Sequence, residues 1–191
     1  MSPGPTGVFL EQVDAVVVAF DLRGFSSLAA HRSPVELGAL LTRFYEHVED
    51  IVEKTKGQIV RWQADIVLAA WLSSPRLTDY RAKALEAVRA AIDTQVPWAD
   101  AGVADGMPAL IYSVAAAAGT VLAGQLGTAK RRQFDVLGEP ASVAARLAVV
   151  ATQREVSHLV TADCCAGLPG PAVEAEPIEL GGKGYRLYRV A

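Results

Sequence analysis

The sequence has few features of an exported or membrane-bound protein. Its only cysteines, Cys164 and Cys165, are adjacent, and adjacent cysteines rarely pair with each other. A disulfide-stabilised secreted scaffold is therefore excluded, and a reducing compartment is expected. The first residues lack the positive charge and apolar run of a secretion signal. The longest apolar stretch, residues 109–126, is interrupted by polar residues and glycines, which excludes a membrane span. We expect a cytoplasmic protein without a membrane partner.

An excess of basic residues is also missing. The chain has 18 lysines and arginines against 21 aspartates and glutamates, for a net charge of −3. Nucleic-acid backbones require a basic surface, so a nucleic-acid partner is not expected. Lys130, Arg131 and Arg132 form a local basic cluster, which predicts a solvated loop, with a phosphate contact as the alternative.

The apolar content, 51% of 191 residues, is enough for a substantial core and excludes wholesale disorder. We expect a flexible lead at residues 1–13 and one domain at 14–191. Apolar periodicity predicts helices at 33–52, 79–94 and 141–150, a loop at 97–106, and strands at 14–22, 58–62, 66–71, 110–117, 121–126, 134–137, 158–161, 175–180 and 185–190. Ser33, Pro34 and Glu36 form a helix-start signature. The order predicts an α+β fold with a ferredoxin-like core, in which helices pack on one face of a mixed, mostly antiparallel sheet.

Two aspartates stand where predicted strands end. Asp21 closes the buried strand at 14–22, and Asp65 lies in the turn between the strands at 58–62 and 66–71. In a ferredoxin-like sheet these segments can be neighbours, and converging carboxylates repel each other unless a cation lies between them. Mg²⁺ and Mn²⁺ are bound through one or two carboxylates plus substrate phosphates, and Gly24 would let the backbone approach a phosphate. Each aspartate alone also fits a turn or a helix cap.

Four segments, in order and spacing, carry a resemblance to a known family: FDLRGFSSL at 20–28, GQIVRWQADIVLAAW at 57–71, GTVLAGQLG at 119–127 and FDVLGEPASVAARL at 134–147. Over residues 14–190 the chain resembles the catalytic domain of class III nucleotidyl cyclases. The resemblance implies a head-to-tail homodimer with active sites at its interface. It also implies conversion of ATP into cyclic AMP and pyrophosphate with two Mg²⁺ or Mn²⁺ ions per site. A heterodimer with a complementary chain is the alternative assembly.

Site residues follow from the resemblance position by position. It implies that Asp21, Asp65 and the carbonyl of Leu22 bind the metal ions. It implies that the backbone of Gly24 and Phe25, together with Lys183, binds the triphosphate. It also implies that Asp135 recognises the base and that Arg146 stabilises the charge on the phosphates. Asp135 accepts a hydrogen bond from an exocyclic amino group, which favours adenine over guanine.

Several positions depart from the family pattern. Arg61 stands where the family has a base-reading lysine, Ala64 where it has a glycine, and Ser142 where an asparagine orients the ribose. Glu139 and Gly181 also differ from the usual residues. Arginine and lysine are both donor-only, so Arg61 can still meet an acceptor on adenine, whereas Ser142 makes a weaker ribose contact. The alternative function is therefore a catalytically weakened cyclase-like domain that acts as a nucleotide-binding or dimerising regulatory module. A third interpretation is a diguanylate-cyclase-like relative, but the sequence lacks the Gly-Gly-Asp/Glu-Glu-Phe signature of that class.

Overall fold

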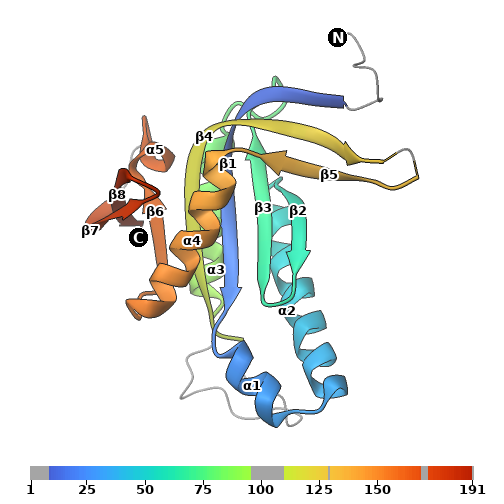
Figure 1. Cartoon of the computed structure of the whole chain (residues 1–191). Helices are drawn as coiled ribbons and strands as arrows, with labels where there is room; N and C mark the ends of the chain where they lie inside the picture. Colours follow the sequence, from blue (N-terminus) through green and yellow to red (C-terminus); the bar gives the residue numbers. More distant parts are fainter. Residues whose placement is uncertain (1–8, 96–109, 129, 169–171, 191) are drawn as a thin grey trace.

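The computed structural model describes residues 9–95, 110–128, 130–168 and 172–190 (Figure 1). The loop predicted at 97–106 and most of the predicted N-terminal lead lie outside the described residues. The elements follow in the order β1 (Phe9–Leu22), α1 (Phe25–His31), α2 (Pro34–Lys54), β2 (Gln58–Gln63), β3 (Ile66–Leu72), α3 (Tyr80–Asp93), β4 (Tyr112–Gly127), β5 (Arg132–Leu137), α4 (Glu139–Gln153), β6 (His158–Thr161), α5 (Ala162–Cys165), β7 (Ala172–Leu180) and β8 (Lys183–Val190).

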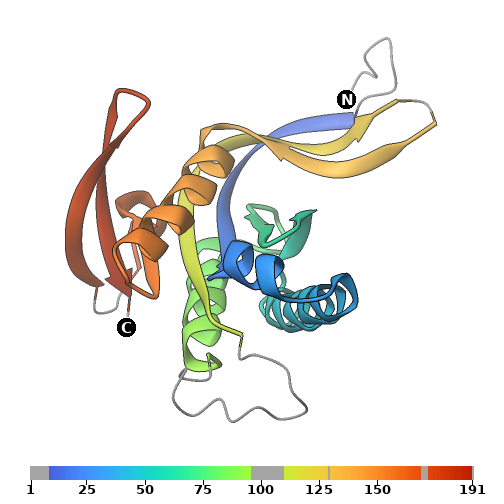
Figure 2. The same cartoon turned by 60° about the horizontal axis from the view of Figure 1, so that its bottom comes forward.

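One sheet organises the described residues. Its strand order is β2-β3-β1-β4-β6-β8-β7, with β5 paired to β4. The pair β4–β6 is parallel, and the other pairs are antiparallel, which confirms the predicted mixed, mostly antiparallel sheet. The start of β1, the outer part of β4 and β5 reach beyond the helices as an arm of the sheet (Figures 1 and 2). Strand β1 lies between β3 and β4, so its last residues are flanked on both sides.

Helices cover both faces of this sheet, so the expectation that they pack on one face is wrong. Side chains of β1 alternate: Val16, Val18 and Phe20 pack in one core cluster with α2 and α3. Val17 and Ala19 pack in a second cluster with α4. The sequence of β1 gives the physical reason for helices on both faces. A strand that is buried on both faces has a continuous run of apolar residues, and β1 has such a run.

Helix α2 begins as the sequence predicts. Ser33 Oγ accepts a hydrogen bond from the Glu36 backbone N–H, and the Glu36 carboxylate accepts one from the Ser33 backbone N–H, which completes the capping box. Buried side chains at Phe44, Val48 and Val52 then fix the helix on the sheet.

Several elements differ from the prediction, and the largest differences are at β1, β4 and α1. Strand β1 begins at Phe9, the segments at 110–117 and 121–126 belong to the single strand β4, and the short helix α1 was not predicted. Helix α1 follows Gly24, whose φ of 72° lies in the left-handed region that favours glycine. Among the helices of the described ranges, none is long and apolar enough to cross a membrane.

Candidate active site

The structure brings Asp21 and Asp65 together at the end of β1. The register of β1 on β3 sets Asp21 opposite Ile66, and the Leu22 backbone N–H donates to the Asp65 carbonyl at 2.8 Å. Asp21 is buried, with only 8% of the residue exposed. Burial raises the pKa of the Asp21 carboxyl, and the neighbouring charge of Asp65 raises it further. The convergence inferred from the strand order is therefore present.

This donor set fits a hard divalent cation. A cation beside Asp21 and Asp65 would offset both the burial of the first carboxylate and its repulsion by the second. Within the described ranges no cluster of three or more histidine, cysteine or acidic side chains could hold a metal. The remaining ligands would have to be backbone carbonyls, water or substrate oxygens, which is the way in which Mg²⁺ and Mn²⁺ are commonly held.

The backbone next to the carboxylate pair is accessible. Gly24 lies at the start of α1, and apart from its two chain neighbours no described residue has an atom within 4 Å of the position that a Cβ would occupy there. Phe25 is the first residue of α1 and packs its half-buried ring against the α2 and α3 core cluster. The open side of Gly24 leaves room for a ligand against this turn.

Arg61 and Asp135, the predicted base-recognition residues, contact each other directly. Arg61 Nη2 on β2 donates to both Asp135 carboxylate oxygens on β5, at 2.9 Å each. The Val136 backbone N–H also donates to Asp135 Oδ1 at 2.8 Å. Asp135 is buried, whereas the Arg61 side chain is 40% exposed. One acceptor and several free guanidinium donors are thus presented side by side.

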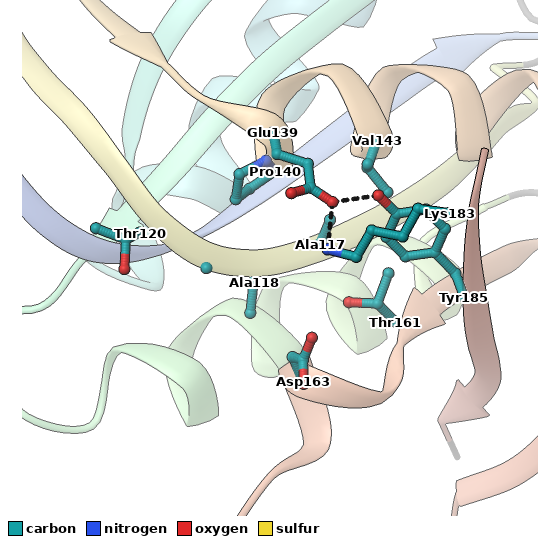
Figure 3. Close-up of a pocket in the computed structure, with 11 residues that line it drawn as sticks. Ala117, Ala118, Thr120, Glu139, Pro140, Val143, Thr161, Asp163, Lys183 and Tyr185 are labelled. Carbon is teal, nitrogen blue, oxygen red and sulfur yellow. Dashed lines mark hydrogen bonds and ion pairs between the residues drawn. The ribbon is translucent and has the colours of Figure 1, made fainter. Parts of the chain in front are cut away.

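Ser142, Arg146 and Lys183 line one open groove of about 400 Å³ between α4 and the β7–β8 hairpin. Lys183 Nζ donates to Glu139 Oε1 at 2.6 Å, and the Tyr185 hydroxyl donates to the same oxygen. Figure 3 shows both side chains converging on the Glu139 carboxylate. The bond from Lys183, followed by that from Tyr185, lowers the pKa of Glu139. The lysine predicted to meet terminal phosphates therefore already has an anionic partner.

A single chain does not bring the carboxylate pair to this groove. Thr152, near the C-terminal end of α4, donates to Asp21 Oδ2 at 3.3 Å, so Asp21 is held at that end of the helix. Ser142 lies ten residues earlier on α4, which corresponds to about 15 Å along the helix axis. Asp21 therefore lies beside the C-terminal end of α4, whereas Ser142 lies near the N-terminal end of that helix.

Sequence reasoning missed three residues that contact the predicted ones. Thr152 bonds Asp21, and Glu139 and Tyr185 surround the Lys183 ammonium. Glu139 was noticed as a departure from the family pattern, and that was the available signal. Thr152 has no such signal, because its contact joins residues 131 positions apart.

Comparison with known proteins identifies the family. The model of the adenylate and guanylate cyclase catalytic domain matches residues 8–184. Two uncharacterized proteins of Mycobacterium tuberculosis, Rv1318c and Rv1320c, are 32% and 33% identical to the chain over 152 and 141 residues. These matches cover 80% and 74% of this chain but 27% and 24% of the relatives, so the chain spans about a quarter of their length.

Solved structures agree on the fold. The adenylyl cyclase CyaB from P. aeruginosa superposes with a TM-score of 0.81 at 16% identity, over 96% of both chains. The guanylyl cyclase Cya2 superposes with a TM-score of 0.79 at 16% identity, over 95% of this chain and 93% of that one. The chain belongs to the adenylate and guanylate cyclase catalytic domain family, the class III nucleotidyl cyclases.

Proposed function

We propose that this domain converts ATP into cyclic AMP and pyrophosphate. The observation that carries the proposal is the pair of Asp21 and Asp65, two repelling carboxylates at an accessible turn, in a family of lyases that act on nucleoside triphosphates. In this reaction the ribose 3′-oxygen forms a bond to the α-phosphorus, the bond from that phosphorus to pyrophosphate breaks, and the hydroxyl proton is released.

Asp21, Asp65 and the Leu22 carbonyl would hold the divalent cations, for which Mg²⁺ and Mn²⁺ are the candidates. Bound there, such cations lower the pKa of an attacking hydroxyl and neutralise charge on phosphate oxygens. The burial of Asp21 supports this role, because a rigidly held carboxylate positions its ligand better than a mobile one.

The groove on α4 would bind the sugar and the phosphates. Arg146 would stabilise the negative charge that develops on the phosphates, and loss of such a donor typically costs about 10²–10³ in kcat. Lys183 would contact the terminal phosphates with donors that Glu139 does not use, since an ammonium group has three N–H bonds. Ser142 would orient the ribose through its single hydroxyl.

A preference for ATP over GTP is supported by the pair of Arg61 and Asp135. Ionised Asp135 is acceptor-only and suits the exocyclic amino group of adenine, whereas guanine carries a carbonyl at that position. The free guanidinium donors of Arg61 suit the adjacent ring nitrogen of adenine, which is an acceptor.

The composite site requires a second chain. Homologues of this family act as dimers, and the separation of Asp21 from Ser142 and Arg146 along α4 supports a head-to-tail homodimer here. In such a two-fold assembly each reaction centre takes its carboxylates from one chain and its α4 groove from the other.

Turnover by purified protein tests the activity. The protein is incubated with Mn²⁺ and either ATP or GTP, with Asp21→Ala as the control. Cyclic AMP formation that exceeds cyclic GTP formation, and that Asp21→Ala abolishes, is the expected result. Cyclic nucleotide at the level of the Asp21→Ala background would contradict the proposal.

Complementation tests the shared site. Asp21→Ala and Arg146→Ala are expected to be inactive separately. In an equimolar mixture half of the dimers combine the two variants, and one of the two sites in each is intact, so about a quarter of the wild-type rate should return. No recovery in mixtures that exchange subunits would exclude composite sites.

The regulatory module is the second candidate. Arg61 and Lys183 each already share donors with a carboxylate, Asp135 and Glu139, and this competition favours a domain with weakened turnover. This function predicts nucleotide binding that depends on Mn²⁺, measured by calorimetry, without formation of cyclic nucleotide.

A further inference from the structure

A partly buried chain of hydrogen-bonded polar side chains adjoins Asp21. Ser113 on β4 pairs with Asp21 across the β1–β4 ladder and is fully buried. Thr152 reaches the same position from the last turn of α4. The bonds run from Arg23 Nε to Ser113 Oγ at 2.8 Å, between Ser113 Oγ and Thr152 Oγ1 at 2.8 Å, and from Thr152 Oγ1 to Asp21 Oδ2 at 3.3 Å.

The chemistry of the end groups fixes the direction of these bonds. Arg23 has only donors, so Ser113 Oγ accepts from it. The ionised Asp21 carboxylate has only acceptors, so Thr152 donates to it. The Ser113 hydroxyl must then donate to Thr152, and each hydroxyl accepts one bond and donates one. Every hydroxyl in this chain is satisfied, and bonds aligned in one direction polarise and strengthen one another.

The cationic end of the chain is itself fixed. The Arg23 backbone N–H donates to the Ile111 carbonyl at 2.8 Å, and its Nη2 donates to the Val156 carbonyl. In the described part of the molecule Arg23 reaches Asp21 through the two hydroxyls and forms no ion pair with it. The arginine thus orients the carboxylate at a distance and leaves its negative charge for another cation.

We propose that Thr152 is a positioning residue for Asp21, and that the Arg23–Ser113–Thr152 chain holds this carboxylate in the orientation that binds the divalent cation. The inference rests on the metal-binding role of Asp21 in the proposed function. Outer hydrogen-bond partners that orient metal-binding side chains typically account for 10- to 100-fold in metal affinity. The threonine acts only through Asp21 and contacts no reacting atom.

Mn²⁺ alone is the probe. Free Mn²⁺ is measured by electron paramagnetic resonance in titrations of the full chain. The same titration of Asp21→Ala gives the Mn²⁺ affinity that remains without the carboxylate. Thr152→Val keeps the shape of the side chain but removes the hydroxyl, and we expect its dissociation constant for Mn²⁺ to rise about tenfold. Thr152→Ser keeps the hydroxyl and should stay within about twofold of wild type.

A second variant guards against misfolding. Ser113→Ala interrupts the chain without altering α4, and it should weaken Mn²⁺ binding in the same direction. Circular dichroism melts establish that each variant is folded before it is titrated. Should Thr152→Val unfold, Ser113→Ala decides the question.

The outcomes separate this inference from the proposed function. Unchanged Mn²⁺ affinity in Thr152→Val, or equal losses in Thr152→Val and Thr152→Ser, would overturn the positioning role while cyclase activity stands. Mn²⁺ binding by wild type that does not depend on Asp21 would overturn it as well. A tenfold loss restored by serine, in a protein that forms no cyclic nucleotide, would support the positioning role and reject the activity.

Discussion

One guanidinium nitrogen of Arg61 bonds both carboxylate oxygens of Asp135, at 2.9 Å each, across 74 residues of sequence. The pair is formed without a bound base, and it joins a half-exposed guanidinium group to a buried carboxylate. Base selectivity in the proposed reaction therefore depends on a preformed acceptor beside a preformed donor.

Asp135→Asn is expected to relax the preference for ATP. An amide both donates and accepts, so it can meet the amino group of adenine or the carbonyl of guanine. The ratio of kcat/KM for ATP to that for GTP should fall about tenfold, the effect of one hydrogen bond to a charged group. Glu174→Gln disrupts a comparable but exposed pair with Arg186 and should leave the ratio unchanged. An unchanged ratio in Asp135→Asn would remove this residue from base recognition.

Glu139→Gln is expected to lower KM for the nucleotide several-fold with little change in kcat. The substitution removes a negative charge beside the groove and releases Lys183 from its ion pair, and both effects favour a polyanionic triphosphate. The matched control is Glu179→Gln, which removes an exposed carboxylate from the β7–β8 hairpin that carries Lys183. Initial rates over a range of Mn²⁺-nucleotide concentrations give KM and kcat separately. A higher KM in Glu139→Gln would mean that Glu139 orients Lys183 for the nucleotide instead of competing with the nucleotide for it.

Asp21→Asn is expected to stabilise the metal-free protein at neutral pH. Because burial raises the folded-state pKa of Asp21 above its unfolded value, the folded protein binds this proton more tightly. Stability is then lost as pH rises from the unfolded pKa through the folded one. We expect Asp21→Asn to melt about 3 °C higher at pH 7.5 in EDTA, which corresponds to about 1 kcal/mol at this chain length.

The same melts at lower pH provide the check. As pH falls through the raised pKa of Asp21, the protonated carboxyl comes to resemble asparagine, so the difference in Tm should shrink. Glu49→Gln, on the exposed side of α2, should show no such trend. A difference that widens on acidification would contradict the raised pKa.

Ala64→Gly is expected to stabilise the domain by up to about 1 kcal/mol. Ala64 occupies the turn before Asp65 with φ of 49°, a left-handed conformation that costs a residue with a Cβ about 1–3 kcal/mol, partly offset by the greater unfolded-state freedom of glycine. Ala39→Gly, on the exposed side of α2, should instead destabilise by about 1 kcal/mol. Urea denaturation measures both, and a loss of stability in Ala64→Gly would show that this turn is not strained.

Local patterns predicted the local features well. The apolar run before Asp21, and the pairing of Ser33 with Glu36, have their causes within a few residues, so strand β1 and the start of α2 could be read from the sequence. The strand order then implied that Asp21 approaches Asp65.

Long-range contacts could not be read in this way. The bonds from Thr152 to Asp21 and from Lys183 to Glu139 depend on how α4 crosses the sheet, and no periodicity encodes that crossing. The coverage of both sheet faces was predictable, because β1 does not alternate between apolar and polar residues. The alanines on its α4 side allow the close approach of an alanine-rich helix.

Helix α4 is uninterrupted and carries Ser142 in its first turns, Arg146 at its middle and Thr152 near its end. In the proposed dimer these residues serve different reaction centres, so any axial shift that nucleotide imposes on the first half is transmitted to the carboxylate of the other centre. The two centres are then mechanically linked, and we expect the rate to depart from a hyperbolic dependence on nucleotide concentration.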